Sequence, residues 1–523
     1  MVNGQAWMVL TPLATLLGAA ILTPIIASAA KRVKPGGGKA VDVFAILGFT
    51  AALYTLYRLY LQVYYSGPIS MVLDPYLPVK GGVELHVDIF SVYMAMLFCG
   101  LGLLASIYSA KYMEGDTGLE YYYLLLLTLV AGMIGVAFAG DFFNLFVSWE
   151  LMCISSYALV SFRKYRWEPV EAGFKYLMMS SVGSLIILYG ISLLYGLTGT
   201  VNFRLIRIGL DSIAEKGIPS SLYFLVAFII AGFGVTASIV PFHTWLPDAH
   251  PAAPSPISAM LSGVVIKAGV YGLARSLFTL FNPAAFDYGT VILAFAALTM
   301  TVANFTALLQ RDIKRLLAYS SIANIGYITA GLGIAAYTLS HYYSVDPGLA
   351  LRVALIAASG GLFHIFNHAI GKGLLFLCSG CFAHETGTRD ISRLEGVGRR
   401  MFLTGTSFSL GLFSLAGVPP LSGFWSKLFI ILAGLSIAGD SALYTVVAIL
   451  IFNSILSAAY YLWLMQRIML RKPTGVAAEA VEAPGSMVIP IIILAALSVI
   501  VGLAPGGMIT LMEYVGKAMM GGW

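Results

Sequence analysis

The sequence predicts an all-α polytopic membrane protein, and two observations lead to this prediction. Apolar residues make up 59% of the 523-residue chain and charged residues only 10%, whereas a soluble domain carries roughly a quarter charged residues. Apolar runs of about 20 residues recur along the chain, and a helix of that length crosses ~30 Å of hydrocarbon. No long polar stretch separates these runs, so we expect a single membrane domain over residues 1–523.

We predict about 14 transmembrane helices from the apolar runs. Their approximate ranges are 6–30, 41–65, 87–110, 120–139, 141–162, 171–197, 221–246, 254–280, 288–310, 315–337, 349–382, 403–433, 442–466 and 486–512. The first run has no basic leader and continues directly into Lys31 and Arg32. This pattern is typical of a retained helix and not of a cleaved signal.

The positions of Lys and Arg predict how these helices are oriented. With both termini on the outer side, eighteen of the 30 basic residues fall in inner loops and six in outer loops or the tail. Such a bias toward the cytoplasmic side is the rule for membrane proteins. We therefore predict a multi-pass protein of the cell (plasma) membrane, and we interpret the net charge of +6 as a topology signal that implies no nucleic-acid partner.

Prolines interrupt two of the predicted helices: Pro241 lies in the seventh, and Pro419 and Pro420 lie in the twelfth. A proline removes a backbone donor and clashes with the preceding turn, so each helix should unwind locally. Unwound backbone at membrane depth persists where protein shields it or where it lines a wet cavity. Breaks at matching places indicate an inverted-repeat transporter with its ion site beside them. The alternative is that these prolines merely kink two structural helices.

The two breaks lie five helices apart, and an odd offset inverts the orientation, so we expect two inverted five-helix repeats with broken seventh and twelfth helices. The expected division is helices 1–3 in 1–118, the first repeat in 119–280 (helices 4–8), the second in 288–470 (helices 9–13), and a last helix and tail in 486–523.

Several ionisable residues lie inside apolar runs, where a charge costs at least about 2.5–3.5 kcal/mol. Glu150 and Lys267 lie in the fifth and eighth helices. His364, His368 and Lys372 recur at every fourth position, so they share one helix face. Buried carboxylates, amines and imidazoles change protonation when their surroundings change. These residues are candidates for ion translocation, and the alternative is a set of structural salt bridges and packed histidines.

The sequence predicts neither a metal nor a cofactor. His364 and His368 have a spacing that zinc sites use, but no thiolate or carboxylate lies within a turn and Lys372 shares their face. Cys378 and Cys381 have redox-like or metal-like spacing, but a single pair cannot close a tetrahedral site, so packing is the favoured interpretation.

Five segments resemble the antiporter-like subunits of respiratory complex I, a family that includes the large subunits of Mrp-type Na+/H+ antiporters and the membrane arms of energy-converting, membrane-bound hydrogenases. The segments are VPFHTWLPDAHPAAPSPISAMLSGVVIKAGVYGL, QRDIKRLLAYSSIANIGYI, HIFNHAIGKGLLFL, HETGTRDISRLEG and LAGVPPLSGFWSKL. The resemblance covers roughly residues 90–470. It implies fourteen helices in two inverted repeats with discontinuous seventh and twelfth helices.

The resemblance also implies roles for single residues. Glu150 matches the fifth-helix glutamate, Lys267 the eighth-helix lysine that bridges two half channels, and Lys427 the terminal lysine or glutamate. The family pairs its glutamate with a lysine five residues before the first break, where this chain has Thr236. Either Lys175 partners Glu150 instead, or the N-terminal half channel is altered or idle.

Polar residues near the first break complete the set of candidates. His243 and His250 flank the break and are candidates for sensing or relaying protons. Asp248 is expected to cap the helix that restarts there, and Asp141 to cap a helix at the surface. Water and hydroxyl groups would link the ionisable residues, and the expected hydroxyls are Ser180, Ser181, Ser184, Ser262, Tyr319, Ser320 and Ser321.

The resemblance implies a proton-translocating or Na+/H+-translocating subunit of a complex I-related respiratory complex. The first choice of host is an archaeal hydrogenase-type or sulfur-reductase-type complex, and an Mrp-type antiporter is the second. The implied partners are other membrane subunits, lipid, H+ or Na+, and peripheral redox subunits. Two other classes stay open: a non-pumping structural subunit, which Thr236 favours, and a self-sufficient transporter of a small solute.

Overall fold

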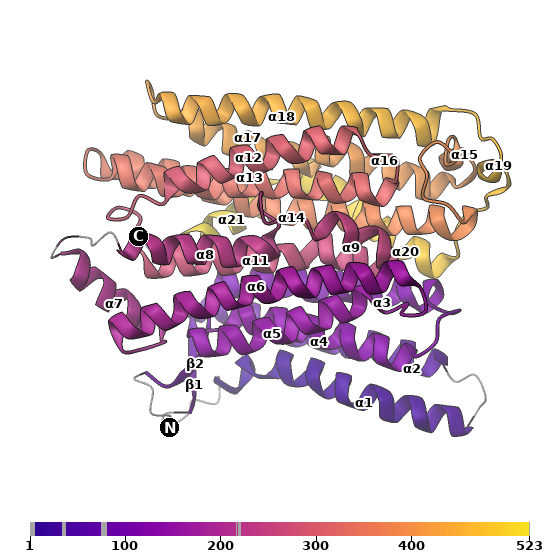
Figure 1. Cartoon of the computed structure of the whole chain (residues 1–523), viewed down its shortest axis with the longest axis horizontal. Helices are drawn as coiled ribbons and strands as arrows, with labels where there is room; N and C mark the ends of the chain where they lie inside the picture. Colours follow the sequence, from indigo (N-terminus) through magenta and orange to yellow (C-terminus); the bar gives the residue numbers. More distant parts are fainter. Residues whose placement is uncertain (1–5, 34–37, 75–80, 216, 218–220, 522–523) are drawn as a thin grey trace.

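The computed structural model is a bundle of long helices that run side by side (Figure 1). It describes residues 6–33, 38–74, 81–215, 217 and 221–521. In this part of the chain, 12 helices are long and apolar enough to cross a membrane. They are α1 (Thr11–Val33), α2 (Gly38–Ser66), α3 (Ile89–Tyr112), α4 (Leu119–Phe138), α5 (Phe142–Val160), α6 (Trp167–Thr198), the run from α10 (Ser255–Met260) through a π-helical turn (Leu261–Val265) to α11 (Ile266–Leu280), α12 (Gly289–Leu308), α13 (Ile313–Tyr342), α14 (Pro347–Thr386), α18 (Ser441–Met465) and α20 (Gly485–Leu503).

The two predicted helix breaks are confirmed. The first lies between α8 (Ser221–Ala237) and α9 (Leu246–Ala252), and the second between α16 (Phe402–Ala416) and α17 (Ser422–Leu435). Across the first break, the Trp245 indole donates to the Val235 carbonyl at 2.8 Å, so a side chain beyond the break ties back to the end of α8. The count of fourteen crossings stays a prediction, because it requires each broken pair to count as one crossing.

Three features differ from the prediction. A two-stranded antiparallel hairpin of β1 (Ile69–Asp74) and β2 (Val83–Val87) precedes α3, and the amphipathic helix α7 (Phe203–Ala214) follows α6. The expected last helix over 486–512 is divided into α20 and α21 (Gly506–Met519). The hairpin and α7 are too short to give a membrane-length apolar run, so a search for such runs misses them.

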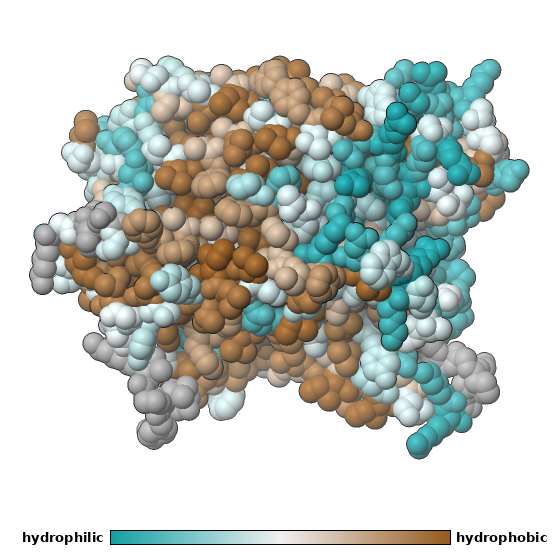
Figure 2. Space-filling view, in the orientation of Figure 1, coloured by the Kyte–Doolittle hydropathy of each residue, from teal (hydrophilic) through white to brown (hydrophobic). Residues whose placement is uncertain are grey.

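Short elements complete the chain. They are a 3-10 turn (Ala6–Val9), α15 (Val397–Arg400), a π-helical turn (Gln466–Leu470) that ends α18, and α19 (Val476–Glu479). Figure 2 shows hydrophilic residues gathered at the end of the molecule where α15 and α19 lie, and a hydrophobic band beside them. This end is called the polar end below, and the opposite end, which carries β1 and β2, is called the hairpin end.

Close packing of α13 against α14 forms the centre of the bundle. A Cβ atom added to Gly331 of α13 would lie 2.9 Å from the Ala357 carbonyl oxygen and 2.9 Å from Gly361 Cα, both in α14. Only glycine allows two backbones to approach so closely. Polar side chains on the two helices are therefore within hydrogen-bonding reach of each other.

Candidate functional site

The three ionisable residues of α14 lie deep in the bundle. His364, His368 and Lys372 belong to one uninterrupted helix, and each is completely buried. The Lys372 ammonium donates to the Leu317 carbonyl at 3.0 Å and also to the Ser320 hydroxyl, both on α13. Its described partners are neutral oxygen atoms, and no described carboxylate forms an ion pair with it.

Lys267 connects to Lys372 through hydroxyl and carbonyl groups. Its ammonium donates to the carbonyl of Ser262, which lies in the π-helical turn before α11. The Ser262 hydroxyl is 2.6 Å from the Ser321 hydroxyl, and Ser321 donates to the Leu317 carbonyl at 2.8 Å. That carbonyl also accepts from Lys372, so the two buried lysines are joined by a continuous polar chain. Single π-helical turns occur often at functional sites.

His364 bridges α13 and α17. Its Nε2 atom lies 3.0 Å from the Asn324 side-chain oxygen, and its Nδ1 atom lies 2.9 Å from the Ser426 hydroxyl. The Asn324 amide donates to the Ser320 carbonyl, which fixes the orientation of this amide and makes Nε2 the donor of the histidine. Asn367 donates to Ser426 at 2.9 Å. Asn324 thereby links His364 to the residues around Lys372.

His368 stands between His364 and Lys372 on the same face. Its ring lies 6.3 Å from the ring of His364, and the two planes are nearly parallel at 5°. Neither ring nitrogen hydrogen-bonds a described protein group. Both nitrogens are therefore available to exchange a proton with neighbours on the row.

Lys427 lies at the second helix break. Its ammonium donates to the Leu415 carbonyl at 2.9 Å, near the end of α16. This helix end leaves carbonyls without intrahelical partners, and its dipole attracts a cation. The ammonium also lies 4.7 Å from the centre of the Tyr327 ring, which is 5.8 Å from the His364 ring. Tyr327 thus joins Lys427 to His364.

We call these five ionisable residues, Lys267, Lys372, His368, His364 and Lys427, the lysine–histidine row. Among the expected hydroxyls, Ser262, Ser320 and Ser321 lie on the row. Ser180 and Ser184 make no hydrogen bond to described groups, Ser181 is exposed, and Tyr319 makes no contact that joins it to the row.

Sequence reasoning missed Asn324, Tyr327, Asn367 and Ser426. A signal existed for the first two: Ser320, Asn324 and Tyr327 recur at helical spacing, and an asparagine is costly in an apolar helix unless it has partners. Asn367 is also an asparagine in an apolar helix and gives the same signal, whereas Ser426 gives none, because its importance comes from the packing of α17 on α14.

Of the two alternatives for the N-terminal half, the pairing of Lys175 with Glu150 is not found in this structure. The Lys175 ammonium instead contacts Glu171 at 2.9 Å and Asp248 at 3.3 Å, at the polar end. Asp248 also contacts Arg315 at 3.1 Å. Asp248 does not cap the restarting helix as expected, because it lies inside the first turn of α9 and its carboxylate serves these ion pairs. Both corrections have one cause: sequence order does not show how α6, α9 and α13 meet.

Glu150 lies apart from the row. It is half-buried on α5, on the same side of the helix as the exposed residues Phe143, Val147 and Ile154. Its Oε1 atom is buried and hydrogen-bonds no group in the described ranges, and the described residues offer it no ion pair. Asp141 caps α5 as expected, although it is fully buried and not at a surface.

The first break packs against the helix of Lys267. Thr236, buried at the end of α8, meets Gly269 of α11 so closely that a Cβ atom on Gly269 would collide with the backbone of Thr236 and Ala237. Pro241 and His243 both lie in the unwound segment between α8 and α9. His250 is completely buried in α9, with its ring stacked 4.4 Å from the ring of Phe376 of α14.

Two adjoining charged cavities of about 300 and 340 Å³ open at the polar end. The smaller is lined by Glu171, Lys175 and Asp248, among others, and the larger by the buried Lys314. The Lys314 ammonium donates to the Ala253 carbonyl at 2.9 Å. In the described ranges no group of three or more His, Cys, Asp or Glu side chains is arranged to hold a metal ion.

Comparisons with known proteins agree with this geometry. The family model described as NADH:quinone oxidoreductase/Mrp antiporter, transmembrane, matches residues 139–345 and 348–457, and the model of the complex I chain 5 N-terminus matches residues 79–123.

Among curated relatives, NADH-quinone oxidoreductase subunit N of Desulforudis audaxviator is 31% identical over 82% of this chain and 83% of its own length. One of the Na(+)/H(+) antiporter subunits of Alkalihalophilus pseudofirmus is 34% identical over 78% of this chain and 49% of its own length.

Among solved structures, a chain of the membrane-bound sulfane sulfur reductase, an archaeal respiratory membrane complex, superposes with a TM-score of 0.84 at 30% identity, covering 98% of both chains. The chain therefore belongs to the NADH:quinone oxidoreductase/Mrp antiporter family, as an antiporter-like membrane subunit.

Proposed function

We propose that this subunit translocates protons, or exchanges Na+ for H+, and so couples redox energy to an ion gradient in a complex I-related respiratory complex. The observation that carries the proposal is the lysine–histidine row. Five buried ionisable groups lie along it, and four of them, all but His368, hydrogen-bond neutral side chains or carbonyls of the bundle. A purely structural network would pair buried charges with opposite charges, because an unpaired buried charge is costly.

The row suits proton transfer because its lysines are held by neutral acceptors. The ammonium of Lys372, for example, donates to a carbonyl and a hydroxyl, which support either protonation state without fixing one. Like charges also interact along the row, because two charges ~8 Å apart repel by about 2 kcal/mol at an effective dielectric constant of 20. A proton that arrives at Lys267 therefore favours release further along the row.

For the host complex, a sulfur-reductase-type or hydrogenase-type assembly of archaea is favoured by the full-length likeness to the sulfane sulfur reductase chain. An Mrp-type antiporter is the second candidate, supported by the likeness to the Na(+)/H(+) antiporter of Alkalihalophilus pseudofirmus. In either assembly the partners would be other membrane subunits and lipid, and in the first they would include peripheral redox subunits. The cell membrane, with both termini on its outer side, is the proposed location.

The outward side of α5 supports a partner within the membrane. Glu150 lies there among exposed apolar side chains and has no cationic partner among the described residues of its own chain. An ionisable group at this depth is stable when it is paired. We infer that a neighbouring subunit covers this side of α5 and brings a cation or a hydrogen-bond donor to Glu150.

A structural role for the N-terminal half is the second candidate. Thr236 cannot carry a charge, and Lys175 is engaged by Glu171 and Asp248 instead of Glu150. These two observations favour a chain in which the first half positions its neighbours while the lysine–histidine row alone conducts ions.

The test is ion pumping by the intact complex in sealed vesicles. If the row conducts, Lys267→Ala and Lys427→Ala will each abolish most of the gradient while the complex still assembles and transfers electrons. A proton ionophore and a sodium ionophore, added separately, identify the ion that moves. Unchanged gradients in both variants would make the row a structural network.

A further inference from the structure

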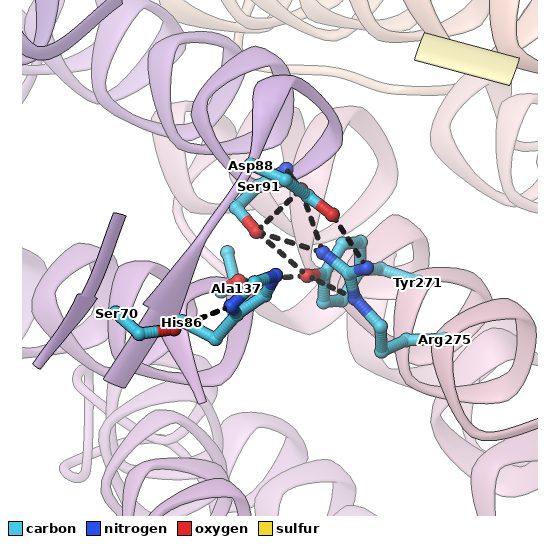
Figure 3. A network of polar contacts seen from close by, with 7 residues as sticks. All are labelled: Ser70, His86, Asp88, Ser91, Ala137, Tyr271 and Arg275. Atoms are coloured by element: carbon cyan, nitrogen blue, oxygen red, sulfur yellow. Dashed lines mark hydrogen bonds and ion pairs between the residues drawn. The ribbon is translucent and has the colours of Figure 1, made fainter. Parts of the chain in front are cut away.

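A buried ion pair lies at the hairpin end, away from the lysine–histidine row (Figure 3). Asp88 precedes α3 and accepts from the Ser91 backbone N–H at 2.8 Å. The two terminal nitrogens of Arg275 each donate to one carboxylate oxygen of Asp88, both at 2.7 Å. The side chains of Arg275 and Asp88 are only 6% and 8% exposed. This is a bidentate ion pair that is almost completely buried.

Two further donors of Arg275 are also occupied. One terminal nitrogen donates to the Ser91 hydroxyl at 2.8 Å, and Nε donates to the Tyr271 hydroxyl at 3.0 Å. Tyr271 in turn donates to the Ala137 carbonyl of α4 at 2.7 Å. The guanidinium lies 5.3 Å from the centre of the Phe90 ring. Arg275 therefore ties α11 to α3 directly and to α4 through Tyr271.

The network continues to the surface of the hairpin. His86 of β2 precedes Asp88 by two residues, and its Nδ1 atom lies 2.8 Å from the hydroxyl of Ser70, its partner on β1. Ser70 is exposed and His86 is half-buried. Figure 3 shows these two residues on one side of the Asp88–Arg275 pair and α11 on the other.

The same helix carries Lys267, and the spacing is regular. Lys267, Tyr271 and Arg275 occur at every fourth position of α11, so they lie along one face, and all three are buried. This face leads from the lysine–histidine row to the hairpin end. The Asp88–Arg275 pair lies at the end of this helix face that is farther from Lys267.

We propose that the Asp88–Arg275 pair is a seal that isolates Lys267 from the water on the hairpin side. This role rests on the proposed function, since a seal is needed only if Lys267 carries ions. Arginine does not release its proton in proteins, so Arg275 cannot act as a carrier. Both oxygens of Asp88 are engaged by Arg275. Neither member of the pair can therefore hand a proton along α11 while the pair is closed.

Stability alone does not account for such a pair. A buried ion pair is often no more stabilising than apolar side chains of the same volume, because both charges lose their hydration. A pump, in contrast, needs a barrier wherever its buried carriers come close to an aqueous phase. Without one, the gradient runs back through the carriers.

The seal can be tested without turnover. The intact complex, in sealed vesicles, is given a potassium diffusion potential, and the passive entry of protons is followed with a trapped pH dye. Arg275→Gln should raise this entry several-fold over wild type. The double variant Arg275→Gln/Lys267→Ala should return it to the wild-type rate, because the leak must pass through Lys267. Asp116→Asn, which breaks the ion pair with Arg163 outside the network, is the matched control and should not leak.

Two results would overturn the proposal: an assembled Arg275→Gln complex that does not leak, or a leak that persists when Lys267 is removed. If Arg275→Gln does not assemble, Asp88→Asn removes the charge that holds Arg275 and is judged by the same criteria. Failure of the seal is distinct from failure of the proposed function. If only the seal fails, Lys267→Ala still lowers redox-driven pumping. If the proposed function fails, Lys267→Ala has no effect on pumping.

Discussion

Neutral hydrogen-bond acceptors around the buried lysines are the feature of single residues that matters most. Asn324 accepts from His364 and donates to the Ser320 carbonyl, so it links the two parts of the row without adding a charge. A carboxylate at this position would attract protons to both His364 and Lys372 and hold them there. The neutrality of position 324 therefore bears directly on ion release.

The variant Asn324→Asp tests this point. We expect redox-driven pumping to fall about tenfold at neutral pH. We also expect its pH profile to move about 1–3 units toward alkaline pH, because a neighbouring opposite charge changes a pKa by about 1–3 units. Pumping and electron transfer are measured in parallel from pH 6 to 9. Asn324→Leu is the control that removes the hydrogen bonds without adding charge. A pH profile identical in Asn324→Asp and Asn324→Leu would contradict the prediction.

Asp88 gives a prediction about pH and stability. Burial alone would raise the pKa of its carboxyl, but the adjacent Arg275 charge and its hydrogen bonds lower that pKa to about 2. A lowered pKa stabilises the fold at every pH above the unfolded value of 3.8, and this stabilisation is lost as the pH falls toward 2. The shift corresponds to about 2 kcal/mol.

We therefore expect Asp88→Asn to lower the melting temperature of the purified complex by the same amount at pH 7 and at pH 5. The difference in melting temperature between wild type and variant should narrow only below about pH 4, where wild-type Asp88 starts to bind a proton. Thermal unfolding at a series of pH values measures this difference. A difference that already closes between pH 7 and pH 5 would mean that Asp88 is not held ionised by Arg275.

At the scale of elements, the contact of α13 with α14 sets the geometry of the row. Gly331 allows this contact, since a Cβ atom there would lie 2.9 Å from the Ala357 carbonyl oxygen. Separation of the two helices would stretch the bond between Asn324 and His364, which is 3.0 Å long. The packing of one glycine thus bears on the hydrogen bond between Asn324 and His364.

Gly331→Ala should destabilise the complex by about 1–3 kcal/mol, the usual cost of overpacking, and lower the ions moved per electron pair. The control is Gly196→Ala in α6, where an added Cβ atom meets nothing within 4 Å. Melting temperature and pumping ratio are measured for both. Equal effects of the two substitutions would show that the close contact is not what positions the row.

Elements also show where sequence reasoning succeeds. Long apolar runs and prolines identify the membrane helices and both breaks, because hydrocarbon imposes helix length and proline removes a donor. The row on α14 follows from a spacing of four residues. The hairpin and α7 are not predicted, since neither depends on membrane crossing, and the partners of Lys175 depend on tertiary contacts between α6, α9 and α13.

At the scale of the whole molecule, the buried groups form two regions with different chemistry. The lysine–histidine row has neutral acceptors, and hydrogen bonds tie all its members except His368 to the surrounding bundle. The hairpin end has a closed ion pair in which Arg275 makes four hydrogen bonds. Under the proposed function, the row would change its charge while the pair would not, as expected of a conductor with one closed side.

The most direct test of the row is the number of ions moved per electron pair in the intact complex. Lys372→Met removes the central ammonium and keeps an unbranched apolar side chain, and Lys111→Met removes an exposed lysine that pairs with Glu114 as the matched control. We expect a lower ratio for Lys372→Met and a wild-type ratio for Lys111→Met, with electron transfer and assembly retained in both. A wild-type ratio for Lys372→Met would contradict the claim that ions pass along the row.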